Sequence, residues 1–165
     1  MKLSNNERHV LKLLLKNGRV TDTEISKKLG ITAQGVGKIR KKLEDKGIIK
    51  GYSVRLDYSG LGINVFAIGL FKFVSGRWGR SEDRDIKERI KGEHIIATYR
   101  VPEGDVTHIV VYGFRTLEEL DDYFQNLQNQ RKEVSELKKL YIFSEKSLIK
   151  DSAEQLLLKV IDGME

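Results

Sequence analysis

The sequence predicts an α+β protein of two domains, because the spacing of its apolar residues changes near residue 50. Apolar residues recur every three or four positions between residues 4 and 46, whereas later segments alternate or are continuously apolar. Charge divides in the same region: residues 1–60 contain 14 Lys and Arg against 6 Asp and Glu, and the remaining 105 contain 16 against 18. We therefore expect a basic helical domain over residues 1–60 and a slightly acidic domain over residues 61–165.

Three helices are predicted in the first domain. Ser4 with Glu7, and Thr21 with Glu24, match the capping box that opens a helix. Gly30 follows the second helix and suits the left-handed conformation of a tight turn. The apolar positions around this glycine have the offsets at which two helices pack across such a turn: Ile25, Leu29, Ile31, Val36 and Ile39. The segment therefore predicts a helix-turn-helix, with a three-helix packing unit that does not contact DNA as the alternative.

The outer face of the third helix is polar and basic. If Val36, Ile39 and Leu43 face inward, steps of 100° turn Gln34 and the lysines outward. In the DNA major groove a glutamine can pair with an adenine edge, an alanine methyl can meet a thymine methyl, and a lysine can reach a guanine or a phosphate. A glycine there allows close approach, and the backbone N–H groups at a Thr cap offer a phosphate site. We expect double-stranded DNA as a partner, contacted by Thr32, Ala33, Gln34, Gly37, Lys38, Lys41 and Lys42.

A strand is expected directly after the third helix. Tyr52, Val54 and Leu56 alternate with polar residues, which is the period of a strand. A strand at this place is typical of a winged helix-turn-helix or of a ribbon that connects two domains. The glycines within residues 58–62 suggest a flexible junction, so we place the domain boundary near residue 60.

The second domain is predicted to have the order β-α-β-β-α-β of a ferredoxin-like fold. Residues 65–74 are almost wholly apolar, as in a central strand covered on both faces. The other elements are expected as strands over 95–101, 106–114 and 137–143, helices over 81–91 and 116–127, and an extra C-terminal helix over 148–161.

A small sheet with helices on one side leaves its other face uncovered. A second copy of the chain would cover that face, and two-fold symmetry would place two third helices on successive major grooves. We therefore expect a homodimer or higher homo-oligomer. The alternative is that the C-terminal helix folds back over the face.

The residues that could perform chemistry do not form a catalytic set. His9, His94 and His108 are scattered over different predicted elements, so we expect no metal site. The absence of cysteine excludes disulfides and thiolate chemistry. No apolar run reaches the length of a membrane span, and the N-terminus lacks a signal-peptide core. We expect a cytoplasmic protein that is not an enzyme, with no catalytic or metal-binding residues and no cofactor.

Several stretches of the chain together resemble the Lrp/AsnC (feast/famine) family of transcriptional regulators. The resemblance rests on residues 17–31 and on positions in the third helix and the segment after it: Val36, Lys38, Ile39, Leu43, Glu44, Gly47, Gly51, Tyr52, Leu56, Asp57, Leu61 and Gly62. It extends over about residues 4–143. It implies a sequence-specific DNA-binding regulator whose ferredoxin-like domain forms dimers and higher assemblies and responds to a small, amino-acid-like effector.

This chain departs from the family pattern at two sites. Lys38 stands where family members usually have arginine, and the two side chains are not equivalent in bidentate base recognition. The effector turn, Gly-x-aromatic-Asp in the family, is here Gly104-Asp105-Val106-Thr107. The resemblance implies Gly104, Asp105 and Thr107 as effector-binding residues, with the acid either replaced by Thr107 or shifted to Asp105. The C-terminal helix also extends beyond the usual family length.

Two other functions stay open at this point. Siroheme decarboxylases resemble this two-domain build and are enzymes that bind a tetrapyrrole, for which His94 or His108, with Arg77 or Arg100, would be the candidates. The basic third helix and the lack of paired histidines favour DNA binding instead. The third hypothesis is an effector-binding partner that modulates other regulators.

Overall fold

The computed structural model describes residues 2–73, 92–101, 104–131, 135–150 and 152–164, and it divides the chain into two compact units. The helical unit comprises residues 1–55 together with 150–165, and the sheet unit comprises residues 56–149. The chain first passes from the helical unit to the sheet unit between residues 55 and 56, and the boundary was expected near residue 60. The C-terminal segment differs from expectation, because residues 150–165 group with the helical unit and not with the second domain.

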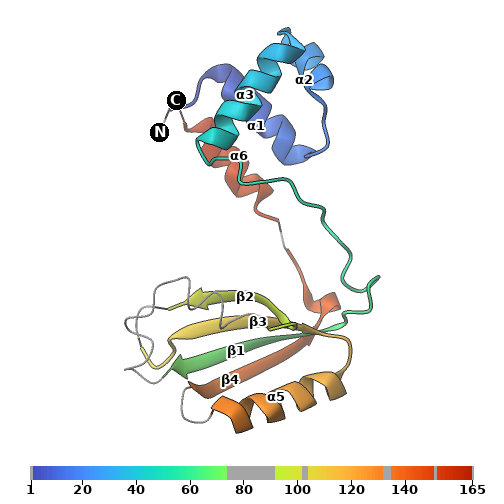
Figure 1. Ribbon diagram of the computed structural model, residues 1–165, viewed down its shortest axis with the longest axis vertical. Coiled ribbons are helices and arrows are strands. Elements are labelled where there is room, and N and C mark those ends of the chain that lie inside the picture. The colour runs from blue at the N-terminus through green and yellow to red at the C-terminus, as the bar shows by residue number, and fades with distance from the viewer. Residues whose placement is uncertain (1, 74–91, 102–103, 132–134, 151, 165) are drawn as a thin grey trace. The chain divides into compact units, whose positions relative to one another are not determined.

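The helical unit contains α1 (Asn5–Lys16), α2 (Asp22–Leu29) and α3 (Ala33–Asp45), as Figure 1 shows. The capping boxes predicted at Ser4 and Thr21 are both formed, with the hydroxyl accepting from the N3 backbone and the N3 glutamate accepting from the cap backbone. Gly30 ends α2 at φ 66°, in the left-handed region expected for this turn. The local signals therefore produced the predicted helices.

The core of the helical unit lies where the three helices meet. Its buried members come from all three helices and their connections: Leu3, Val10, Leu14, Val20, Ile25, Val36 and Leu43. Leu29, Ile31 and Ile39 are partly buried and pack against this cluster. The apolar offsets around Gly30 are thus confirmed as the packing contacts of the helix-turn-helix.

A fourth helix, α6 (Glu154–Asp162), completes the helical unit by packing against α1. The backbone N–H of Leu3 donates to the Met164 carbonyl (3.2 Å), and Arg8 Nη1 donates to the Asp162 carbonyl (3.3 Å). Ile161 is the buried residue of this helix. Leu156, Leu157 and Val160, which the sequence placed on the same apolar face, are exposed. α6 therefore packs within the helical unit, whereas the alternative left open by the sequence had it fold back over the sheet.

The strand predicted at Tyr52–Leu56 is wrong, since residues 50–57 have no strand or helix. The side chains of Tyr52, Val54 and Leu56 are exposed. An alternating pattern produces a strand only when a neighbouring strand pairs with it, and none of the described residues does so here.

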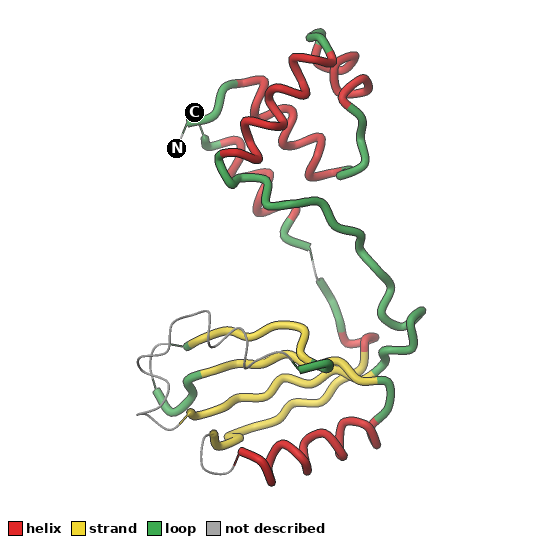
Figure 2. Tube along the Cα trace, in the orientation of Figure 1, coloured by secondary structure: helices red, strands yellow, loops and turns green. Residues whose placement is uncertain are grey.

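The sheet unit holds four antiparallel strands in the spatial order β2-β3-β1-β4 (Figure 2). They are β1 (Val65–Phe73), β2 (Ile95–Arg100), β3 (His108–Phe114) and β4 (Ser135–Ser144), with α5 (Leu117–Arg131) between β3 and β4. This is the strand order and α+β class expected for the ferredoxin-like plan. The helix predicted over residues 81–91, like Arg77, lies outside the described residues.

The helix α5 covers one face of the sheet. Its Leu120 and Phe124 are buried with Ala67, Phe71 and Tyr112 of the strands. Leu117, expected on the inner face of this helix, is exposed.

The other face of the sheet is only partly covered, although the sequence predicted that β1 would be covered on both sides. Register pairs Tyr99 with Ile109 and Ile68 with Val111, so these side chains share this face with Leu70. We call it the open face. Tyr99 is 59% exposed and Tyr141, which pairs with Ile68, is 46% exposed.

Within the part of the chain that the structure describes, no helix is both long enough and apolar enough to cross a lipid bilayer.

Candidate nucleic-acid interface

The helix-turn-helix presents α3 with one side buried and the opposite side in solvent. Thr32 caps α3, and its Oγ1 accepts from the Gly35 N–H (3.0 Å). Val36 and Leu43 are fully buried. Gln34, Lys38 and Lys41 are exposed, as their positions on the helix predicted, and Ala33 is half-buried. The structure therefore brings together a polar, basic surface on a helix held by its own core.

Gly37 lies at the side of α3 that faces the start of α2. A Cβ atom at Gly37 would come within 3.1 Å of the Asp22 Oδ2. A contact this short leaves little space for a methyl group. The sequence suggested that the glycine allows close approach to DNA, whereas in the structure it leaves room for the Asp22 carboxylate at the start of α2.

Lys42 has a partner inside the protein. Its Nζ lies 2.8 Å from the Glu7 Oε1, and Lys46 Nζ lies 3.7 Å from the same oxygen. Glu7 is buried, and hydrogen bonding to Lys42 and to the Ser4 backbone lowers the pKa of its carboxyl to about 2. The ion pair ties the end of α3 to the start of α1, so a phosphate contact by Lys42 has to compete with it.

The sequence analysis missed Arg40, which fixes the other side of α3. Its Nε (2.9 Å) and Nη2 (2.6 Å) donate to the Asp22 Oδ1, and Nη2 also donates to the Val20 carbonyl (3.0 Å). Arg40 lies one helical turn from both Val36 and Leu43, so it falls toward the inner side of α3. This spacing could have predicted that its guanidinium binds a partner within the protein.

Two side chains of the predicted effector turn, Asp105 and Thr107, form hydrogen bonds with β1. Gly104 has φ 95°, in the region that favours glycine. Lys72 Nζ donates to the Asp105 Oδ1 (2.8 Å), and this hydrogen bond lowers the pKa of the Asp105 carboxyl. Thr107 Oγ1 accepts from the Phe73 N–H (2.8 Å) and donates to the Phe71 carbonyl (3.2 Å). Thr107 therefore joins the start of β3 to the end of β1.

The histidines considered for tetrapyrrole binding are packed into the sheet unit. His94 stacks on Phe114, and its Nδ1 donates to the Gly113 carbonyl (3.2 Å). His108 is buried, its Nδ1 lies 3.0 Å from the Thr107 Oγ1, and its ring meets the Phe73 ring edge to face. Burial lowers the pKa of His108. Among the described residues, no group of three His, Asp or Glu side chains could hold a metal ion.

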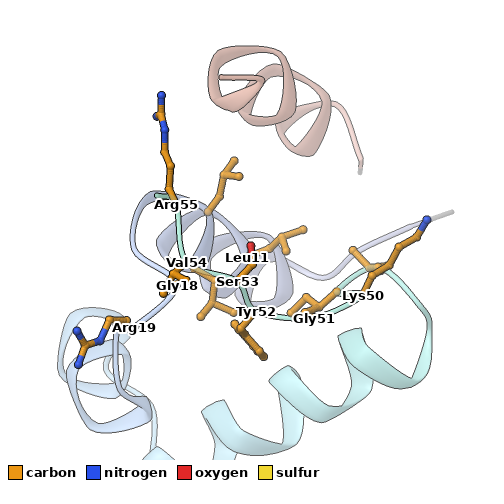
Figure 3. A pocket seen from close by; sticks show the side chains of 13 residues that line it. Leu11, Gly18, Arg19, Lys50, Gly51, Tyr52, Ser53, Val54 and Arg55 are labelled. Carbon is orange, nitrogen blue, oxygen red and sulfur yellow. The ribbon is translucent and has the colours of Figure 1, made fainter. Parts of the chain in front are cut away.

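A groove of about 1030 Å³ opens in the helical unit between α1 and residues 48–55 (Figure 3). Leu11, Leu14 and Leu15 of α1 line one side. The cationic ends of Arg19 and Arg55 extend away from the lined space in Figure 3. The groove offers apolar contact rather than charge pairing. The groove was not predicted, because a strand was expected at this place.

Known proteins with similar sequences also contain a helix-turn-helix. A family model described as winged helix-turn-helix DNA-binding matches residues 3–50. An uncharacterised HTH-type transcriptional regulator of Pyrococcus furiosus is 32% identical over 127 residues, which is 77% of this chain and 82% of that protein. The HTH-type regulator LrpA of Pyrococcus horikoshii is 32% identical over 75% of this chain and 84% of its own length.

Solved structures share the fold at lower identity. A Neisseria meningitidis transcriptional regulator in complex with L-Met has a TM-score of 0.76 at 18% identity, over 93% of this chain and 96% of that one. E. coli AsnC has a TM-score of 0.74 at 17% identity, over 92% of this chain and 99% of that one.

The fold and the exposed face of α3 thus define a DNA-binding protein of the helix-turn-helix class. The chain belongs to the Lrp/AsnC family of transcriptional regulators, as the sequence resemblance predicted. It is a DNA-binding transcriptional regulator.

Proposed function

We propose that the regulator recognises DNA through the outer face of α3, inserted in the major groove. The supporting observation is the exposure of Gln34, Lys38 and Lys41 on a helix whose opposite side is buried. Gln34 is suited to an adenine edge and Lys38 to a guanine edge, with Lys41 on phosphate. The Thr32 cap offers backbone N–H groups to a second phosphate.

The active form in this proposal is a homodimer formed through the open face of the sheet. Ile68, Leu70, Ile109 and Val111 form two adjacent pairs on that face, and the exposed rings of Tyr99 and Tyr141 lie at its margins. A second copy would remove this apolar surface from water. Two copies would also supply the paired recognition helices that successive major grooves require.

The regulatory ligand in this proposal is a small amino-acid-like molecule bound at the Gly104–Thr107 turn. Asp105 and Lys72 are both exposed there and carry opposite charges, which complement the ammonium and carboxylate groups of an amino acid. A similar fold was solved with L-Met. The relatives described above are named as transcriptional regulators, which supports a role without catalysis.

The test is selection of bound duplexes from a random DNA pool, followed by titration of the selected duplex and of a scrambled duplex of equal length. We expect the selected duplex to bind about 1000-fold more tightly, with an affinity that falls steeply as salt rises. Equal affinity for both duplexes at low salt would contradict sequence recognition.

The dimer is tested separately by sedimentation of Val111→Lys, which places a charge on the open face. Leu117→Lys makes the same type of change at an exposed position of α5. We expect the first variant to sediment as a monomer and the second as a dimer. A dimeric Val111→Lys would refute the open face as the interface.

A further inference from the structure

Within residues 50–57, the Tyr52 side chain contacts the recognition helix. The Tyr52 hydroxyl donates to the Glu44 Oε1 (3.0 Å) and accepts from Arg40 Nη1 (3.3 Å). The Arg40 guanidinium also lies over the Tyr52 ring, 5.6 Å from its centroid. Arg40 and Glu44 are four residues apart, so Tyr52 bridges neighbouring positions on one side of α3.

Arg40 extends this contact to the first helix of the helix-turn-helix. The same guanidinium that meets Tyr52 holds the Asp22 carboxylate at the start of α2 and the Val20 carbonyl before it. One side chain therefore connects the start of α2, the middle of α3 and the segment that leads to β1. Because the guanidinium is planar, its donors fix these partners in definite relative directions.

These contacts act on the placement of α3 and not on its formation. The helix is already capped by Thr32 and packed through Val36 and Leu43, which are fully buried. Tyr52 is 51% exposed and contributes little to that core. Its bonds to Arg40 and Glu44 instead oppose rotation or sliding of α3 relative to residues 50–57. Base recognition needs this control, because a binding group displaced by about 0.5 Å loses its geometry.

We propose that Tyr52 is a positioning residue for sequence recognition, acting on α3 through Arg40 and Glu44. The proposal rests on the function proposed above and adds the route by which the chain leading to the sheet unit influences the DNA contacts. Residues 50–57 have no helix or strand of their own. The Tyr52 hydroxyl therefore gives a displacement of this segment a direct route to the middle of α3. Phosphate contacts by exposed lysines do not need this alignment, since they act as flexible point charges.

The first experiment compares wild type with Tyr52→Phe, which removes only the hydroxyl. The probes are the selected duplex and the scrambled duplex of equal length. We expect the ratio of specific to non-specific affinity to fall about fivefold, the equivalent of one hydrogen bond. Affinity for the scrambled duplex and the thermal unfolding midpoint should stay unchanged. Tyr58→Phe is the matched control, because the Tyr58 hydroxyl forms no hydrogen bond with the described residues and its ring packs on Phe66.

A second experiment tests the route with a double-mutant cycle. In the Glu44→Ala background, Tyr52→Phe should reduce the ratio by less than about twofold, because the acceptor of its hydroxyl is already gone. Asp45→Ala, at the neighbouring exposed position of α3, removes the same charge without removing this bond and corrects for the electrostatic change.

The outcomes separate this inference from the proposed function. A wild-type protein that does not distinguish the two duplexes refutes the proposed function itself. A wild type that distinguishes them, with Tyr52→Phe unchanged, refutes the positioning role. Equal losses of affinity for both duplexes also overturn it, because they indicate a loss of folded protein. Full additivity of Tyr52→Phe with Glu44→Ala overturns it as well, because the two residues then act independently.

Discussion

The helical unit completes its structure and its binding surface within one chain, whereas the sheet unit does not. In the helical unit, the three N-terminal helices enclose one core, α6 packs on α1, and Gln34, Lys38 and Lys41 face solvent. In the sheet unit, α5 covers one face and the apolar open face remains accessible. The side chains of Asp105 and Thr107 at the Gly104–Thr107 turn form hydrogen bonds with β1. The exposed face of α3 is therefore formed within a single chain, whereas the dimer interface and the effector site proposed for the sheet unit each require a second copy or a ligand.

The largest effect should follow from removing the exposed charges of α3. We expect Lys38→Ala with Lys41→Ala to weaken binding to the selected duplex about 100-fold or more, because a base contact and a phosphate contact are lost together. Fluorescence anisotropy at several salt concentrations would measure the loss of affinity. It would also give the slope of the logarithm of the binding constant against the logarithm of salt concentration, whose magnitude should fall by about one or two. The control is Lys146→Ala with Lys159→Ala, which removes the same charge at exposed positions elsewhere. An equal loss in the control would mean that net charge alone accounts for binding.

A change in α6 tests whether the C-terminal segment belongs to the helical unit. Ile161→Ala should lower the free energy of unfolding by about 3 kcal/mol, because Ile161 is buried and a cavity would remain. Val160→Ala, at the neighbouring exposed position, should cost less than about 0.5 kcal/mol. Urea unfolding of both variants measures the difference. If both variants lose similarly little free energy of unfolding, the packing of α6 does not stabilise the helical unit.

The buried Glu7 predicts a dependence on pH. Its folded-state pKa of about 2 lies below the ordinary value of 4.5, so the folded protein binds fewer protons than the unfolded protein between these values. The stabilisation is present above pH 4.5 and is lost as pH falls through 2. Glu7→Gln should cost about 2 kcal/mol at neutral pH, less than the full shift implies because Lys42 is largely exposed.

Denaturant titrations of Glu7→Gln at neutral pH and near pH 2 give this comparison, and the difference from wild type should vanish at the lower pH. Glu24→Gln is the matched control, because Glu24 closes the other capping box on an exposed surface. A smaller loss is expected there. Equal losses in the two variants would assign the effect to helix capping and not to the pair with Lys42.

The smallest effect concerns the effector turn. Thr107→Val should destabilise the sheet unit by about 1 kcal/mol, because the Phe73 N–H loses its acceptor. Thr98→Val should be neutral or stabilising, since the Thr98 Oγ1 is buried and has no hydrogen-bond partner among the described residues. Thermal unfolding measures both variants. A neutral Thr107→Val would weaken the view that this hydroxyl holds β3 to β1.

Sequence reasoning succeeded where the controlling interactions are local. The capping boxes at Ser4 and Thr21 and the turn at Gly30 depend on residues within four positions of one another, and all three are formed. The apolar spacing of α3 also predicted its buried side, and therefore the exposed positions of Gln34 and Lys38. The family assignment, which rests on these same local patterns, is correct.

Sequence reasoning failed where a residue distant in the sequence determines the local structure. The alternation of Tyr52, Val54 and Leu56 indicates a strand but supplies no strand to pair with it. The pairing of Lys42 with Glu7 joins residues 35 positions apart, and the contact of α6 with α1 joins opposite ends of the sequence. Periodicity identifies which side of an element is apolar, and it does not identify what covers that side.

The contact between Leu3 and Met164 has a consequence for synthesis of the protein. The ribosome completes residues 56–149 before it makes α6, so the sheet unit can fold while the helical unit still lacks Ile161 and Met164. A nascent chain stalled after residue 149 should hold a protected sheet and an incompletely packed helix-turn-helix. Translation thus completes the packing of the helical unit only after the sheet unit has been made, although α3 is among the first segments to emerge.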